Sequence, residues 1–161
     1  MTEISPVEVT LHIPGAPEDV FPYFTDPVRY VHWMGSEAKL EPVPGGVYRI
    51  KMADGFKAAG EFLVVERPHR GAFTCGFSDE ALAQRTKHEP VEATSGRAMP
   101  PGSTRVTVTL EAEDGGSHLT LRHENLPDPE LREGHRVAWN TYLPRLAVHA
   151  AGGDPGPDPH S

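Results

Sequence analysis

The sequence predicts an α+β fold, in which a curved antiparallel sheet of six or seven strands packs on one long helix. Segments that alternate apolar and polar residues follow one another through most of the chain, and turn signals such as Asp54-Gly55 separate them. The one long helical pattern comes last, at Leu131–Ala150. Hairpin turns make neighbouring strands antiparallel. Because a single helix cannot fill the concave face of a strongly curved sheet, we expect a cavity between the two.

Length, charge and cysteine content limit the classes of function. A chain of 161 residues fits one domain, to which we assign residues 1–150. The net charge of −8 disfavours nucleic acid or an anionic membrane as the main partner. No apolar run has the length of a membrane span, and the N-terminus lacks the basic and apolar regions of a signal peptide. Cys75 is the only cysteine, so an internal disulfide is impossible and we expect a cytoplasmic protein.

The first part of the chain predicts one strand followed by two short helices. Pro6–Ile13 alternates apolar and polar residues, as a half-buried strand does. Pro17 suits the first turn of a helix, and the acidic residues after it lie at the positive end of the helix dipole. Asp26 and Pro27 form a cap followed by proline, which predicts a second short helix that ends near Trp33.

Hairpins account for the middle of the chain. Val47–Met52 and Phe56–Glu66 flank the Asp54-Gly55 turn, and Gly71–Phe77 follows a turn near Pro68. We expect these segments to be neighbouring strands of the sheet.

A long polar segment, Asp79–Gly102, then interrupts the strands. A loop of this length in a compact domain is either functional or disordered, so we treat it as an insertion whose role is open. The strands resume at Ser103–Ala112, and after a turn at Asp114–Gly116 the chain returns along His118–Glu124.

The last helix has an apolar stripe that needs a broad apolar partner. Apolar or aromatic residues and one histidine recur every three to four residues and therefore share one face: Leu131, His135, Trp139, Tyr142 with Leu143, Leu146 and Ala150. The strands upstream supply the partner surface.

Both ends of this helix carry sequence signals. Asp128 is the expected N-cap, with Pro129 as the first helical residue. Pro144 falls inside the helix, where it removes one backbone hydrogen bond and predicts a local kink. Residues 151–161 are rich in glycine and proline, which predicts a disordered tail.

Short motifs in a fixed order relate the chain to a known superfamily. They are Ala16–Phe21, Thr25–Pro27 with Trp33, Pro44–Arg49, Gly60-Glu61, Pro68, Leu119–His123, Leu126-Pro127, and Ala138-Trp139 with Tyr142, Leu143 and Leu146. Through them, from Pro6 to Ala150, the chain resembles the START-like, birch-pollen-allergen-like (SRPBCC) superfamily. Within it, the chain is most similar to bacterial proteins that resemble the activator of Hsp90 ATPase.

The resemblance implies a helix-grip fold with a hydrophobic pocket, in which the sheet wraps around the last helix. It brings no fixed catalytic residues, because members include ligand carriers, cyclases, stress proteins and co-chaperone-like domains. The chain departs from the family pattern in two places. Ala138-Trp139 stands where Gly-Trp is common, and the insertion at Asp79–Gly102 is longer than expected.

Large inward-facing residues are the candidates to line a pocket between the sheet and the helix. The alternative for each of them is ordinary core packing. Histidines and tyrosines among them are the candidate polar anchors of a ligand. The set is Trp33, Met34, Tyr48, Ile50, Met52, Phe62, Phe73, Phe77, His123, His135, Trp139, Tyr142 and Leu143.

Two histidines carry the candidate chemistry. His123 shares a strand face with leucines, and His135 lies on the helix stripe one turn before Trp139. Inside a cavity they could orient a ligand or act as acid and base near neutral pH. The alternative is a buried histidine that a backbone carbonyl satisfies, or a histidine at the rim of the cavity in contact with water. Cys75 is expected to be inert between Phe73 and Phe77.

The sequence offers no pattern for a metal or an organic cofactor, and we predict neither. It contains no His-x-x-x-His pair, nucleophile elbow, phosphate loop or dinucleotide fingerprint, and we assign no catalytic residue.

Three functions remain open. The first is a non-catalytic carrier or sensor that binds a small apolar or aromatic ligand. The second is a stress-related protein-interaction domain like the Hsp90 ATPase activators, which would use the outer face of the sheet or the insertion. The third is a polyketide cyclase-like or dehydratase-like enzyme with a cavity histidine. A homodimer through an edge strand is compatible with each.

Overall fold

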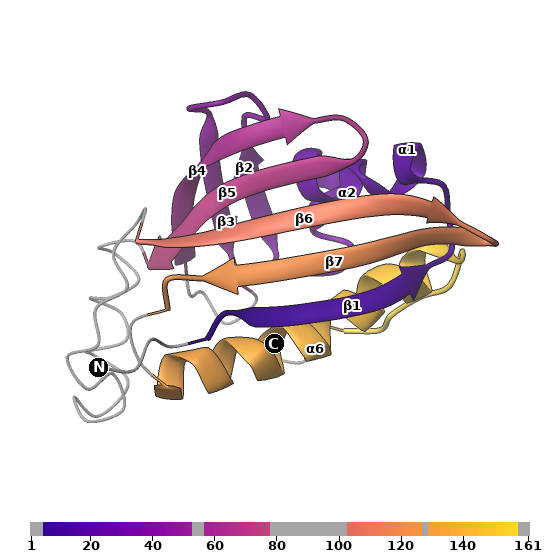
Figure 1. Cartoon of the computed structure of the whole chain (residues 1–161). Helices are drawn as coiled ribbons and strands as arrows, with labels where there is room; N and C mark the ends of the chain where they lie inside the picture. The colour runs from indigo at the N-terminus through magenta and orange to yellow at the C-terminus, as the bar shows by residue number, and fades with distance from the viewer. Residues whose placement is uncertain (1–4, 53–56, 78–102, 127–128, 158–161) are drawn as a thin grey trace.

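The computed structural model describes residues 5–52, 57–77, 103–126 and 129–157, although the side chain of Phe77 is not among the parts described (Figure 1). Seven strands form one antiparallel curved sheet in the order β1-β7-β6-β5-β4-β3-β2, and α6 (Pro129–Ala150) packs beneath it. The predicted fold class is confirmed. The strands are β1 (Val7–Ile13), β2 (Glu37–Leu40), β3 (Val47–Lys51), β4 (Lys57–Glu66), β5 (Arg70–Phe77), β6 (Thr104–Glu113) and β7 (Gly116–Glu124).

The register of the strands separates an inner face from an outer face. Val7 pairs with His123, and His123 pairs with Val106, so these buried residues form one row on the inner face. In the next row, Thr107 pairs with Arg122, and both face outward because successive side chains alternate across a sheet. The inner rows meet α6 and form the core.

Three single-turn helices follow β1 where two were predicted. They are α1 (Pro17–Val20), α2 (Pro22–Thr25) and α3 (Pro27–Tyr30). Each begins with proline, which suits a first helical position because its missing N–H has no partner to lose there. The side chain of Asp26 caps α3 by accepting a hydrogen bond from the backbone N–H of Val28 at 2.9 Å.

The segment after α3 differs from the prediction. The helix ends at Tyr30, and the chain then turns through Gly35, which has a φ of 82°, into β2. Such a φ favours glycine, so a turn at this position is expected on backbone grounds. We did not predict β2, since only Leu40 of its four residues is buried and the alternating pattern is too short to recognise.

The structure describes one of the two predicted Asp-Gly turns. Gly115 has a φ of 80° in the turn between β6 and β7, as expected for an Asp-Gly turn. The Asp54-Gly55 turn, the insertion 79–102 and the N-cap Asp128 lie outside the described residues.

The long helix has the predicted face. Trp139, Tyr142, Leu143 and Leu146 are its buried residues. The helix continues through Pro144, whose ring lies on the exposed side. The carbonyl of Asn140, four residues earlier, loses its hydrogen-bond partner there but also lies on the exposed face, where water can solvate it.

The segment after α6, residues 151–157, makes hydrogen bonds with the helix. Gly152, with a φ of 88°, turns the chain, and the N–H of Gly153 donates to the carbonyl of Val148 at 3.0 Å. Arg145 then donates hydrogen bonds to carbonyls of this segment. Its acceptors there are Pro155 and Pro157 through Nη1, and Gly156 through Nη2, each at 3.0 Å.

A candidate ligand-binding interior at one end of the grip

One end of the sheet gathers the starts and ends of many elements. The register pairs Lys51 with Lys57, Cys75 with Thr104, and Val7 with His123. The ends of β3, β5 and β7 therefore lie beside the starts of β1, β4 and β6, and α6 begins after β7 at the same end (Figure 1). We call it the insertion end, because residues 78–103 connect β5 to β6 there.

A chain of hydrogen bonds crosses the core at the insertion end. The indole N–H of Trp139 donates to Nδ1 of His123 at 3.1 Å. Nε2 of His123 lies 2.8 Å from the hydroxyl oxygen of Thr104, and that hydroxyl donates to the carbonyl of Cys75. Because the one hydroxyl hydrogen of Thr104 goes to Cys75, the Nε2–H of His123 is the donor to Thr104. The direction of donation is thus Trp139 to His123 to Thr104 to Cys75.

This arrangement keeps His123 neutral. The side chain is fully buried. Burial, and secondarily the nearby His135, lower the pKa of His123 to about 3. Both ring nitrogens are already engaged, so the ring has no position for another proton. Near neutral pH, His123 therefore acts as a structural link between β6, β7 and α6.

His135 occupies a less covered position on the first half of α6. Its ring stands edge-on to the ring of His123, with 4.9 Å between the centroids and 88° between the planes. Its Nδ1–H donates to the carbonyl of Leu131 at 2.7 Å. Burial lowers the pKa of His135, and the hydrogen bond to Leu131 opposes this in part. The side chain is half-buried, so a neutral imidazole lies between the core and the surface.

An aromatic cluster fills the interior beside this chain of hydrogen bonds, since Phe73 pairs with Val106, which in turn pairs with His123. The rings of Tyr48 and Phe73 stack with centroids 4.1 Å apart. The hydroxyls of Tyr30 and Tyr48 lie 2.5 Å apart, so the two phenols share a hydrogen bond within the core. Burial is the main cause that raises the pKa of both hydroxyls, and both remain protonated. The indole N–H of Trp33 donates to the carbonyl of Tyr23 at 3.0 Å.

The structure brings most of the predicted pocket residues together as packed core. Met52 and His135 are half-buried instead, and the side chain of Phe77 lies outside the described parts. Low exposure agrees with ordinary core packing, the alternative to a role in lining a pocket. The buried ones are Trp33, Met34, Tyr48, Ile50, Phe62, Phe73, His123, Trp139, Tyr142 and Leu143.

Comparison with known protein families shows to which family the chain belongs. The family model described as "Activator of Hsp90 ATPase homolog 1-like protein" matches residues 15–151. The chain belongs to this family. The predicted resemblance is confirmed, and the protein has the SRPBCC helix-grip fold.

Solved structures extend the comparison. The AHSA1-like protein from Rhizobium etli is 35% identical, with a TM-score of 0.68 over 99% of this chain and 93% of that one. DynU16, from the dynemicin biosynthetic locus, is 21% identical with a TM-score of 0.73, and the match covers 96% of this chain but 51% of DynU16.

A third structure is the Aha1 dimer from Colwellia psychrerythraea, which is 13% identical with a TM-score of 0.69 over 91% of this chain and 96% of that one. At the identities of DynU16 and Aha1, the likeness concerns the fold. None of the curated proteins matched the sequence significantly.

Sequence reasoning missed a second cluster, at the C-terminal end of α6 in this AHSA1-like protein. The rings of His32 and His149 stack with centroids 4.3 Å apart, and Nδ1 of His149 lies 2.7 Å from the hydroxyl of Tyr23. Burial, followed by the charges of His32 and Arg29, lowers the pKa of His149. The histidines border a hollow of about 520 Å³ that Arg145 and residues 153–156 help to line. The two rings come from distant segments, so no local pattern could have paired them.

Neither a metal site nor a membrane-spanning helix occurs in the residues that the structure describes. Among them, no three His, Cys, Asp or Glu side chains gather closely enough to hold a metal ion. In the same part of the chain, no helix is both long and apolar enough to cross a bilayer.

Proposed function

We propose that this AHSA1-like protein is a non-catalytic carrier or sensor, which binds a small apolar or aromatic ligand between the sheet and α6 at the insertion end. The observation that carries the proposal is the half-buried imidazole of His135, which stands over the buried pair of His123 and Trp139. Small-molecule sites are typically apolar with a few placed polar groups, and this end of the interior has that composition.

Partial burial at the insertion end supports the same position for the ligand. Met52, Cys75 and Leu131 are apolar residues that pack on the core but remain partly exposed. Burial raises the pKa of the Cys75 thiol to about 12, so it offers an apolar contact and no thiolate. The buried aromatic residues beside them, such as Tyr48 and Phe73, are already packed against one another.

The hydrogen bonds of the two histidines favour binding over catalysis. His123 has no free ring nitrogen and a pKa of about 3, so it is poorly suited to acid–base chemistry near neutral pH. His135 already uses its Nδ1–H on the carbonyl of Leu131. The cyclase-like alternative, which depends on a cavity histidine, therefore stays a weaker prediction than ligand binding.

Location and assembly belong to the same proposal. We place the protein in the cytoplasm on the basis of its single cysteine. The Aha1 protein from Colwellia psychrerythraea forms a dimer, and β1 and β2 are the edge strands of the sheet here. A homodimer is thus a further prediction, which light scattering after size-exclusion chromatography measures directly. The alternative of an Hsp90 activator-like interaction domain also stays a prediction.

Ligand binding is tested on the purified full chain. Native mass spectrometry measures whether a small molecule co-purifies, and titration with 8-anilinonaphthalene-1-sulfonate measures binding of an aromatic probe. We expect His135→Ala to weaken probe binding at least threefold while the melting temperature changes little.

The matched control is His118→Ala, which removes a histidine on β7, away from α6, and should leave probe affinity unchanged. A wild-type protein that carries no small molecule and binds no probe would overturn the proposal. Equal affinity in wild type and His135→Ala would remove His135 from the site.

A further inference from the structure

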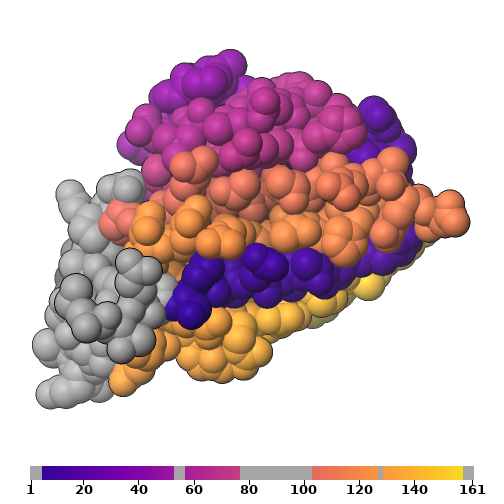
Figure 2. Space-filling view, in the orientation of Figure 1, coloured from indigo at the N-terminus to yellow at the C-terminus, as the bar shows by residue number. Residues whose placement is uncertain are grey.

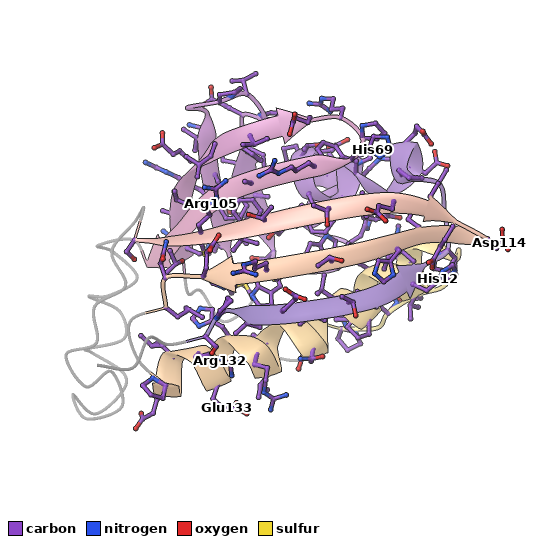
Figure 3. The ribbon with its side chains drawn as sticks, in the orientation of Figure 1. His12, His69, Arg105, Asp114, Arg132 and Glu133 are labelled. Carbon is purple, nitrogen blue, oxygen red and sulfur yellow. The ribbon has the colours of Figure 1, made fainter. Side chains whose placement is uncertain are left out.

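A shallow hollow of about 370 Å³ lies on the outer face of the sheet, away from α6. Threonines of β6 and β7 lie among its lining residues, and charged residues from β1, β5, β6 and β7 complete it. Figure 2 shows this face in space-filling form, and Figure 3 labels Arg105 on it. The lining includes three arginines (Arg70, Arg105 and Arg122) and two glutamates (Glu8 and Glu124).

Two of the arginines have carboxylate neighbours. Nη1 of Arg122 lies 3.7 Å from Glu8, and its Nε lies 3.7 Å from Glu124. Nη1 of Arg70 lies 3.8 Å from Glu66. These separations exceed hydrogen-bonding distance, and the side chains are substantially exposed, so the pairs are weak.

Arg105 differs from both. Within the described residues it has no ion pair, and its Nε is buried without a hydrogen-bond partner. Glu124 is its cross-strand neighbour on β7, but the carboxylate of Glu124 is placed near Arg122 instead. A buried N–H without an acceptor is unfavourable, so a rearrangement that gives this donor a partner is favoured.

The guanidinium of Arg105 defines the chemistry of the partner. Its donors form a planar fork, which matches the two oxygens of a carboxylate. The lining holds three arginines, and Arg105 is the one among them that has no ion pair within the described residues. Attraction of an acidic group is therefore a local property of this hollow.

We propose that the hollow is a docking site for an acidic segment of a partner protein, with Arg105 as the residue that takes a carboxylate. A protein segment suits the site better than a free small acid, because the hollow lies on an open sheet face. A small acid would leave much of its surface in water there, whereas a segment gains contacts along the neighbouring strands. This site is separate from the ligand site between the sheet and α6.

The test uses the full chain and a fluorescein-labelled hexaglutamate peptide, with a hexaglutamine peptide as the uncharged probe. Fluorescence anisotropy at low and high salt measures the affinities. We expect hexaglutamate to bind and Arg105→Gln to weaken binding at least fivefold. Arg49→Gln is the matched control, since Arg49 is an exposed arginine of β3 on the same outer face of the sheet but outside the hollow. This variant should change the affinity for hexaglutamate less than twofold.

Arg105→Lys keeps the charge, loses the fork and is expected to give an intermediate loss, so the proposal stays testable if Arg105→Gln folds poorly. Equal losses in the Arg49 and Arg105 variants would overturn the proposal, as would absence of hexaglutamate binding. Competition by acetate or inorganic phosphate at the same molar concentration as the peptide would also overturn it, because the site would then take any free oxyanion.

Discussion

The indole N–H of Trp139 donates to Nδ1 of His123 over 3.1 Å, and this contact joins α6 to β7 inside the core. It determines the tautomer of His123, whose other nitrogen then donates to Thr104. The helix is thus attached to the sheet by a directional bond as well as by apolar packing. The stability of the packing between α6 and the sheet therefore depends on the side chains of both Trp139 and His123.

Shortening Trp139 is expected to destabilise the protein strongly. Trp139 is 5% exposed, so Trp139→Ala leaves a cavity and should cost about 3–5 kcal/mol in the free energy of unfolding. Trp139→Phe keeps most of the packing but leaves Nδ1 of His123 without its donor, which should cost about 1–3 kcal/mol. Urea unfolding measures both. Val137→Ala, on the exposed face of α6, is the control, and an equally small loss in all three variants would contradict the core role of Trp139.

Stability should fall as the pH drops below about 6.5. The pKa of His123 is lowered from 6.5 to about 3 in the folded protein, so between these values the unfolded chain binds a proton that the folded chain does not. The contribution of this group is complete above the unfolded pKa and is lost as pH falls towards the folded one, by roughly 1.4 kcal/mol for each pH unit. Burial lowers the pKa of His135 as well, which acts in the same direction.

Chemical unfolding at pH 7.0, 6.0 and 5.0 measures this dependence. His123→Gln should flatten the slope, although it also lowers stability at pH 7 by disturbing the hydrogen-bond chain. His118→Gln, which removes a half-buried histidine of β7, is the control variant. A His123→Gln slope as steep as that of the wild type would show that other groups cause the acid sensitivity.

Local pattern predicted much of the fold and less of the site. Periodicity indicated the buried position of Trp139, and together with the Asp128-Pro129 capping signal it indicated the bounds of α6. It could not indicate that His123 accepts from Trp139, because the register of a helix on a sheet depends on the packing of the whole core. For the same reason, a local pattern could not indicate that the rings of His32 and His149 stack on each other. Nor could composition indicate that Arg145 on α6 donates hydrogen bonds to carbonyls of residues 155–157.

The two buried tyrosines should be energetically coupled. Tyr30 and Tyr48 share one hydrogen bond within the core, so removing either hydroxyl leaves the other without that partner. We expect Tyr30→Phe and Tyr48→Phe to cost about 1–2 kcal/mol each, and the double variant to cost less than their sum by at least about 0.5 kcal/mol. Urea unfolding of the four proteins gives the coupling energy. Strict additivity would contradict the shared bond.

Arg145 should hold the tail against α6. Its Nε–H donates to the carbonyl of Trp33 at 3.1 Å, and its Nη groups donate to carbonyls of residues 155–157. Arg145→Ala removes all of these bonds at once. We expect backbone amides of residues 153–157 to exchange with deuterium at least tenfold faster, and the free energy of unfolding to fall by about 1–3 kcal/mol. The control is Arg136→Ala, because that exposed arginine contacts Glu133 on its own helix. If tail exchange were equally fast in wild type and in Arg145→Ala, the tail would not be held by this residue.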